Sequence, residues 1–275
     1  MDNRPIGVFD SGLGGLTGVR ELRRLLPGED IVYFGDTGRV PYGSRSHETI
    51  LQYARQDIAF LLSQNVKCIM AACGTVSSTY PAEEAAKLPV PYMGVVAAAA
   101  RRAARATRSR KIGVIGTPAT IRSHSYEQML RRLVPGVEIT ARPCPLFVPL
   151  VENGYVDGAA ADRRQVTELV IVQYLEPVRA AGVDTLILGC THYPLLAGMI
   201  GAYMGPGVTL IDPGQAAADD LGMLLAGKGL RSGRAEGGRT RFFVSDVPDS
   251  FVRTADLFLG EYRGGTAEQI CIDKY

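Results

Sequence analysis

Residues 68–75 read Cys-Ile-Met-Ala-Ala-Cys-Gly-Thr, and residues 185–191 read Thr-Leu-Ile-Leu-Gly-Cys-Thr. Continuous apolar runs of this kind are typical of strands buried on both faces, so they predict a mostly parallel sheet covered by helices. The two segments are similar to one another. A second internal similarity, between Ile6-Gly-Val and Ile112-Gly-Val, is weaker evidence of a repeat, because many buried strands share such residues. The repeated cysteine predicts two similar lobes, each with a thiol at the carboxyl end of a strand, where open α/β sheets bind ligands.

Apolar runs recur along the whole chain and alternate with segments of helical spacing. Leu51, Ala54, Ile58 and Leu61, for example, fall on one helix face. This alternation predicts an α/β protein. The expected strands are residues 5–9, 30–35, 67–72, 90–96, 111–116, 137–142, 184–189 and 208–212, with 241–245 as a further strand.

The two lobes are expected to be pseudo-symmetric, each a mostly parallel sheet flanked by helices, with the active site between them. Lobe A should comprise residues 1–97 and 208–275 and carry Cys73, and lobe B residues 98–207 with Cys190. The Gly- and Arg-rich residues 227–239 are predicted to form a surface loop.

Composition excludes several classes of protein. The 275 residues carry 30 basic and 28 acidic side chains, a near balance that argues against a nucleic-acid partner. The densest basic run, residues 101–111, is predicted to be a solvated helix face. The amino terminus lacks a signal-peptide pattern, and no apolar window is long enough to span a membrane. Five irregularly spaced cysteines indicate free thiols, so we expect a cytoplasmic protein without disulfides.

Motifs for the common cofactors are missing. A dinucleotide fingerprint would need glycines at 12, 14 and 17, but residue 17 is Thr. No lysine is placed at a strand end where it could hold pyridoxal phosphate. With three histidines in all, a multi-histidine metal site is not expected either. The sequence therefore predicts chemistry with no cofactor and no metal.

Polar residues at the predicted strand ends are the remaining candidates. Asp10-Ser11-Gly12 follows the first strand, and an Asx-type turn with helix capping by Ser11 would explain it equally well. Cys73 alone would most often be a buried structural cysteine. Cys190 is a sharper candidate, because His192 and a following helix amino terminus could both tune its thiol. Cys68, Cys144 and Cys271 are predicted to be structural.

Two opposed thiols have a specific chemical use. A single base returns an abstracted α-proton to the face it left, whereas a thiolate and a thiol on opposite faces invert the carbon. Each group must titrate near the working pH, although a free thiol titrates near about 8.5. Asp10 beside Cys73, and His192 beside Cys190, could supply that tuning.

Five motifs give the chain a specific resemblance: FDSGLGGL (9–16), YFGDTGRVPYG (33–43), CGTVSS (73–78), PLVENG (149–154) and GCTHYPLL (189–196). In these segments the chain resembles the glutamate racemases of the aspartate/glutamate racemase superfamily. The likeness covers almost the whole chain, and GCTHYPLL separates these enzymes best from their aspartate-specific relatives.

The resemblance implies an isomerase that needs no cofactor, supplies D-glutamate for peptidoglycan and forms a homodimer. It makes Cys73 the base toward D-glutamate, assisted by Asp10, and Cys190 the base toward L-glutamate, assisted by His192, with Glu152 as a further acid nearby. The implied substrate contacts are Ser11, Pro41, Tyr42, Gly43, Gly74, Thr75, Thr117, Thr120 and Thr191.

One position differs from the family that the chain resembles, and two other functions stay open. Gly74 stands where the family usually has Asn, so one amide that would contact substrate is missing. A related racemase or decarboxylase would differ at the cysteines or just after the second one, yet both cysteines and His192 are present. A non-catalytic bilobal binding protein would explain the two lobes, but not two cysteines at equivalent strand ends.

Overall fold

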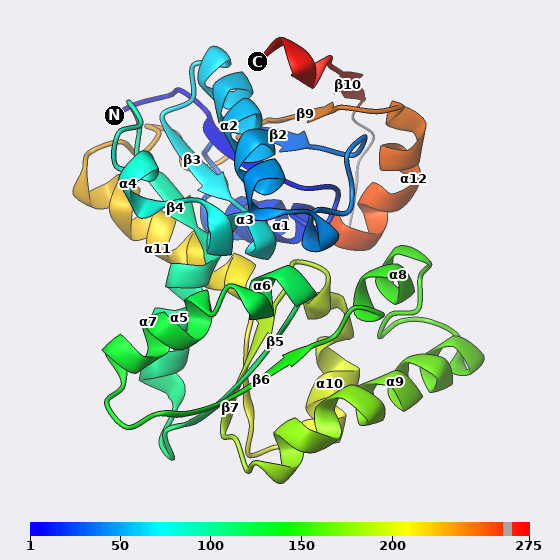
Figure 1. Cartoon of the computed structure of the whole chain (residues 1–275). Coiled ribbons are helices and arrows are strands. Elements are labelled where there is room, and N and C mark those ends of the chain that lie inside the picture. The colour runs from blue at the N-terminus through cyan, green and yellow to red at the C-terminus, as the bar shows by residue number, and fades with distance from the viewer. Residues whose placement is uncertain (261–265) are drawn as a thin grey trace.

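The computed structural model describes residues 1–260 and 266–275, with only the helical backbone described at 249, 250 and 252–254. Two parallel sheets lie in two lobes, one above the other in Figure 1. The first sheet has the order β10-β9-β2-β1-β3-β4 and the second β6-β5-β7-β8. The strands of the first are β1 (Ile6–Asp10), β2 (Ile31–Gly35), β3 (Cys68–Ala71), β4 (Tyr92–Gly94), β9 (Thr240–Val244) and β10 (Ala267–Gln269). Those of the second are β5 (Lys111–Gly116), β6 (Glu138–Pro143), β7 (Thr185–Gly189) and β8 (Thr209–Ile211).

The two sheets repeat one arrangement of strands. Strands β2-β1-β3-β4 of the first sheet have the same order as β6-β5-β7-β8 of the second. Ile6 of β1 pairs with Cys68, and Ile112 of β5 pairs with Thr185. Since Cys73 and Cys190 each follow these partners by five residues, the two thiols occupy equivalent places. The predicted pseudo-symmetric α/β fold is confirmed.

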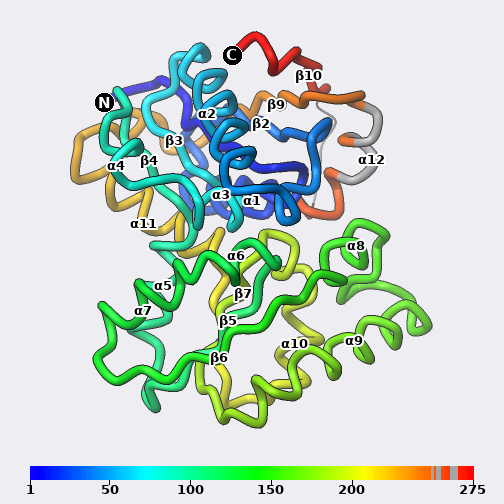
Figure 2. Tube along the Cα trace, in the orientation of Figure 1, coloured from blue at the N-terminus to red at the C-terminus, as the bar shows by residue number. Residues whose placement is uncertain are grey.

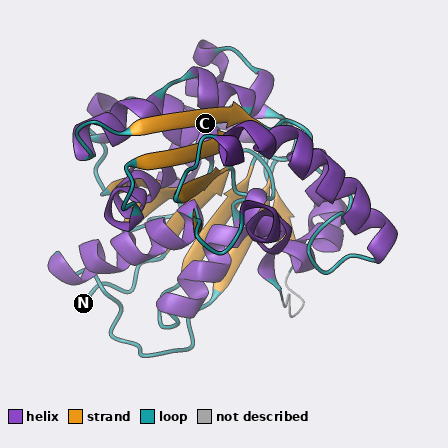
Figure 3. Cartoon of the chain, turned by 90° about the horizontal axis from the view of Figure 1, so that it is seen from below, coloured by secondary structure: helices purple, strands orange, loops and turns teal. Residues whose placement is uncertain are grey.

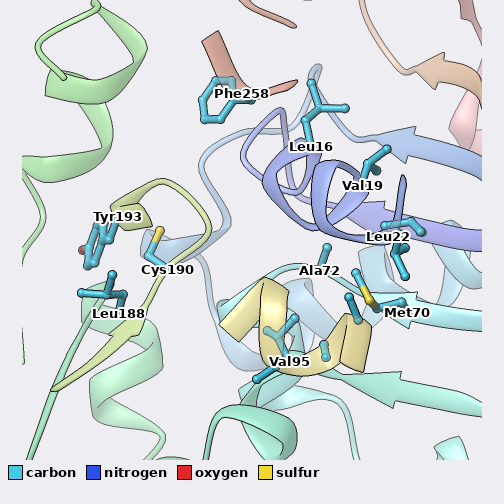
Figure 4. Packing of buried hydrophobic residues seen from close by; sticks show 14 of the residues in the cluster. Leu16, Val19, Leu22, Met70, Ala72, Val95, Leu188, Cys190, Tyr193 and Phe258 are labelled. Carbon is cyan, nitrogen blue, oxygen red and sulfur yellow. The ribbon is translucent and has the colours of Figure 1, made fainter. Parts of the chain in front are cut away.

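Helices cover both faces of the first sheet. On one face lie α1 (Leu16–Leu25), α11 (Pro213–Gly227) and α12 (Pro248–Leu259), and Figure 4 shows Leu16, Val19 and Leu22 of α1 together with Met70 in this layer. On the other face lies α2 (His47–Ser63), which buries Ala54, Ile58 and Leu61 as its spacing predicted. Burial on both faces explains the continuous apolar strands.

The second sheet is covered in the same way. Its faces are packed by α5 (Val95–Ala106) and α7 (Ser125–Leu133) on one side, and by α8 (Phe147–Glu152), α9 (Ala161–Ala180) and α10 (Ala197–Met204) on the other. Figure 3 shows the helices around the strands of both lobes. The short elements are α3 (Gly74–Thr79), α4 (Ala82–Ala85), α6 (Pro118–Arg122), η1 (Tyr42–Ser44), η2 (Tyr193–Leu196) and η3 (Ile272–Lys274).

The chain enters the second lobe through α5 and returns through α11, which packs on both α5 and α1, so both termini lie in the first lobe (Figure 2). The boundary expected at residue 208 is wrong by a few residues, because β8 pairs with β7 and so belongs to the second sheet. The predicted strand 90–96 is also too long. Its last residues, Val95 and Val96, begin α5, because the alanine-rich sequence that follows favours a helix.

Two surface expectations have different outcomes. Of the predicted loop 227–239, Gly227 is the last residue of α11, and residues 228–239 contain no helix or strand; Ser232 N donates to Glu29 Oε1 at 2.8 Å. The basic run on α5 is not simply solvated, since Arg101 and Arg102 form ion pairs with Asp220 and Asp219 of α11. Within the described ranges, no helix has the length and apolar character that crossing a membrane requires.

Candidate active site

A cavity of about 430 Å³ lies where the carboxyl ends of β3 and β7 meet, and both Cys73 and Cys190 line it. Its size is typical of a pocket for a small molecule. The predicted residues that line it are Ser11, Pro41, Tyr42, Gly43, Cys73, Gly74, Thr75, Thr117, Glu152, Cys190, Thr191 and His192. Asp10 and Thr120 do not line the cavity; both are buried directly behind residues that do.

Cys73 lies in a buried, weakly polar environment. It is the residue before α3, and its sulfur lies 3.3 Å from Ser11 Oγ. Burial raises the pKa of the Cys73 thiol to about 12, with a further rise from the charge of Asp10, which the Ser11 hydrogen bond only partly offsets. Without substrate, Cys73 is therefore a neutral thiol.

Asp10 ends β1 and supports this thiol from behind. Its Oδ2 accepts a hydrogen bond from Gly12 N at 3.0 Å, which is the Asx-type turn expected. Its Oδ1 has no hydrogen-bond partner within the part of the chain described. Burial raises the pKa of Asp10, although His192 and the amides of Gly15 and Gly12 oppose the rise. Capping by Ser11 is wrong: Gly15 precedes α1, which leaves the Ser11 hydroxyl free to contact Cys73.

Cys190 has a polar environment built by a histidine and a carboxylate. His192 Nδ1 lies 3.7 Å from the Cys190 sulfur, and Nε2 lies 3.0 Å from Glu152 Oε1 on α8. Burial disfavours a charged ring, yet the hydrogen bonds with Cys190 and Glu152 together raise the pKa of His192 to about 10. The helix expected beyond Cys190 is α10, which begins only at Ala197 after the short turn η2, so the group in contact with the Cys190 sulfur is the His192 ring.

The loop carrying Pro41, Tyr42 and Gly43 is held by a buried cluster of charged groups. Tyr42 Oη donates to Asp36 and, at 3.2 Å, to Asp57 Oδ2. Arg39 bonds both carboxylates, at 2.6 Å to Asp36 and 3.2 Å to Asp57. Tyr42 thus lines the cavity, while its hydroxyl is engaged by Asp36 and Asp57.

A row of hydroxyl groups in contact with one another connects the two lobes beside the cavity. Thr75 Oγ1 lies 3.1 Å from Thr117 Oγ1, which lies 3.0 Å from Thr120 Oγ1. Thr120 therefore orients Thr117 and has no surface on the cavity itself. None of the described residues that line the cavity is a lysine or an arginine, so hydroxyls and backbone amides are the groups present to bind an anion.

Eight lining residues were missed by the sequence reasoning: Gly12, Val40, Ser44, Pro118, Pro145, Val148, Pro149 and Gly189. Gly12, Val40, Pro149 and Gly189 stand inside the quoted motifs, which could have indicated them. Pro145 and Val148 are apolar residues outside every motif, so nothing local marked them. The described residues contain no cluster of three His, Cys, Asp or Glu side chains that could hold a metal, and all five cysteines are free.

Comparison with known proteins places this site in a class. Residues 17–221 match the family described as Asp/Glu/Hydantoin racemase, and the chain belongs to that family. It is 47% identical over 256 residues to the glutamate racemase of Syntrophus aciditrophicus, with 93% of each chain covered. It is 45% identical over 260 residues to that of Geobacter metallireducens, with 94% of each covered.

Solved structures agree with the sequence relatives. Glutamate racemase from Francisella tularensis, solved in complex with D-glutamate, is 39% identical with a TM-score of 0.88, and both chains are covered in full. The resemblance to the glutamate racemases drawn from the motifs is confirmed, as is the expectation of an amino-acid racemase among the isomerases.

Proposed function

We propose that this chain interconverts L- and D-glutamate by proton transfer between Cys73 and Cys190, without a cofactor. One observation carries the proposal: two thiols from equivalent strand ends share one cavity but have different electrostatic surroundings. A site that inverts a carbon needs one base and one acid at the same time. Burial raises the pKa of the Cys73 thiol, whereas His192, whose pKa is raised, holds its ring 3.7 Å from the Cys190 sulfur.

The proposed steps follow from this difference in protonation. With L-glutamate bound, the Cys190 thiolate takes the Cα proton while the Cys73 thiol gives its own proton to the opposite face. The product is D-glutamate, with a Cys73 thiolate and a Cys190 thiol. The reverse reaction starts from that state. His192 stabilises the Cys190 thiolate, and Asp10, a buried carboxyl with a raised pKa, can pass a proton to or from Cys73.

Glutamate as the substrate is supported by the cavity walls and by the relatives. Ser11, Thr75, Thr117 and Thr191 present hydroxyls, and the Pro41–Gly43 loop presents backbone groups, to a ligand with two carboxylates. The Francisella tularensis relative was solved with D-glutamate, and this chain shares 39% of its residues with it.

The cellular setting belongs to the same proposal. D-glutamate would serve peptidoglycan synthesis, and the enzyme would act as a homodimer in the cytoplasm, with a small molecule as its substrate. We place the lobes at residues 1–97 with 212–275, and 98–211, because β8 pairs within the second sheet.

A chiral assay of the purified protein, with no cofactor added, tests the substrate. L-glutamate and L-aspartate are offered separately, and D-glutamate should form from the first alone. Conversion of aspartate alone would assign the chain to another reaction of the same family. Binding of glutamate without conversion would favour the non-catalytic alternative.

A further inference from the structure

Two glycines of the first lobe contact the second lobe on either side of Cys190. Gly74 follows Cys73, and a Cβ added to it would lie 2.6 Å from the carbonyl oxygen of Gly189, the residue before Cys190. Gly14 precedes α1, and a Cβ added there would collide with Thr191 Oγ1 and lie 2.5 Å from His192 Nδ1. Real Cβ atoms essentially never approach another heavy atom within 3.0 Å.

Hydrogen bonds join the lobes at the same places. Thr17 Oγ1 donates to Thr191 O at 3.1 Å and to Gly14 O at 2.8 Å. The Thr75 and Thr117 hydroxyls meet across the lobes one residue from Gly74. At Gly74 the lobes therefore meet with backbone against backbone, and at Gly14 the backbone of the first lobe meets the side chains of Thr191 and His192; neither approach leaves room for a Cβ.

We infer that Gly14 and Gly74 are positioning residues that set the separation of the two catalytic thiols. This inference rests on the proposed two-thiol function. Ordinary contact begins at 3.4 Å, so a methyl group on Gly74 needs about 0.8 Å of extra room. The obstructing atom is backbone of β7, which cannot rotate away as a side chain could, so the strand end that carries Cys190 must move away from Cys73.

Gly74 therefore has a role of its own at the position where the resembling family usually has Asn. With glycine, the carbonyl of Gly189 fills the space that a side chain would take. Restoring asparagine is expected to weaken the enzyme rather than improve it, because its Cβ meets the same carbonyl. The loss of a substrate-contacting amide at this position would alone suggest the opposite result.

A wider gap between the thiols should uncouple removal of the Cα proton from delivery of a proton to the opposite face, two events that the wild-type enzyme couples. The thiolate nearer the substrate can still remove the Cα proton, but the opposite thiol is too far to complete inversion. The same thiol then returns a hydrogen to the face it came from. Once the S–H group has exchanged with D2O, the returned hydrogen is deuterium. Misplacement by about 1 Å can cost about 100-fold in rate.

The test compares Gly74→Ala, Gly74→Asn and Gly14→Ala with Gly207→Ala, a control whose added Cβ meets nothing within 4 Å. Inversion is followed by chiral assay, and Cα deuteration with retention by proton NMR in D2O. Inversion should fall about 10- to 100-fold in each test variant, with the ratio of retained exchange to inversion rising, while Gly207→Ala matches wild type. Thermal unfolding identifies any variant that does not fold. The Gly74 variants decide the matter, because the Cβ added at Gly14 also meets the side chain of His192.

Unchanged inversion in the folded variants, or an equal loss of inversion and exchange, would overturn the inference. The wild-type control separates this result from failure of the proposed function. If wild-type protein neither exchanges nor inverts glutamate, the two-thiol reaction itself is wrong.

Discussion

The Nδ1 atom of His192 lies 3.7 Å from the Cys190 sulfur, and the opposite ring nitrogen lies 3.0 Å from Glu152 Oε1. These contacts raise the pKa of His192 from an ordinary 6.5 to about 10 against the effect of burial. Because folding raises this pKa, the protonated His192 ring adds to the free energy of unfolding. That contribution is complete below about pH 6.5 and is lost as the pH rises through about 10. Racemisation should therefore decline near pH 10, before Cys73 titrates.

Substitution Glu152→Gln tests this assignment. Removing the carboxylate lowers the pKa of His192, so the alkaline decline in kcat/KM should move to lower pH while the fold is kept. The pH profile of initial racemisation rates measures the shift. An unmoved alkaline limb would show that Glu152 does not act through His192.

Asp10→Asn should lower kcat by about 100-fold, because the substitution removes a buried proton-carrying group beside Cys73 but keeps an oxygen for the Gly12 amide. The matched control is Asp212→Asn, a partly buried carboxyl with a raised pKa that accepts hydrogen bonds from the first amides of α11. Asparagine caps helices as well as aspartate does, so the control should keep wild-type kinetics. Equal activity losses in both variants would argue that Asp10 only supports the fold.

Tyr42→Phe should destabilise the protein by about 1–3 kcal/mol, since it leaves the Asp36 and Asp57 carboxylates short of a buried donor. The loop loses its anchor, so KM should rise more than kcat falls. Tyr92→Phe is the control, because the buried Tyr92 hydroxyl has no hydrogen-bond partner among the residues described. Chemical denaturation and steady-state kinetics measure both effects. An unchanged KM in folded Tyr42→Phe would separate the cluster from substrate binding.

Cys73→Ser and Cys190→Ser should each invert glutamate more slowly. Within one variant, kcat/KM should fall by the same factor in both directions, because the two enantiomers are equal in free energy. Exchange of the Cα proton distinguishes the variants. Cys73→Ser keeps the base toward L-glutamate and should deuterate only that enantiomer; Cys190→Ser should deuterate only D-glutamate. Proton NMR in D2O measures both, and the opposite pattern would reverse the assignment of faces.

Much of the fold could be predicted because burial on both faces leaves a direct mark on the sequence. The cysteine echo aligned Cys68 with Thr185, and the strand register pairs these residues with Ile6 and Ile112 in the same way. Strand β10 was missed, because three residues with two exposed positions carry little apolar pattern. The end of β4 was misplaced where strand and helix preferences met at Val95.

The site was predictable as a set of residues but not as a geometry. Motifs indicated Tyr42 and Asp10, yet only the fold shows that the Tyr42 hydroxyl faces Asp36 and that Asp10 lies behind the cavity. The ring of Phe258 packs edge-on against His192, with centroids 5.3 Å apart, although 66 residues separate them. Figure 4 shows Phe258 reaching toward the Cys190 side of the core. Such long-range contacts leave no local sequence signal.

The most direct test of two-thiol inversion is the early course of the wild-type reaction in D2O, starting from pure L-glutamate. The D-glutamate formed first should carry deuterium at Cα, while the remaining L-glutamate keeps its proton, because different thiols serve the two faces. Chiral separation followed by mass spectrometry measures the deuterium content of each enantiomer before equilibrium is reached. Equal deuterium in both from the start would indicate a single base that reaches both faces, and would contradict the account.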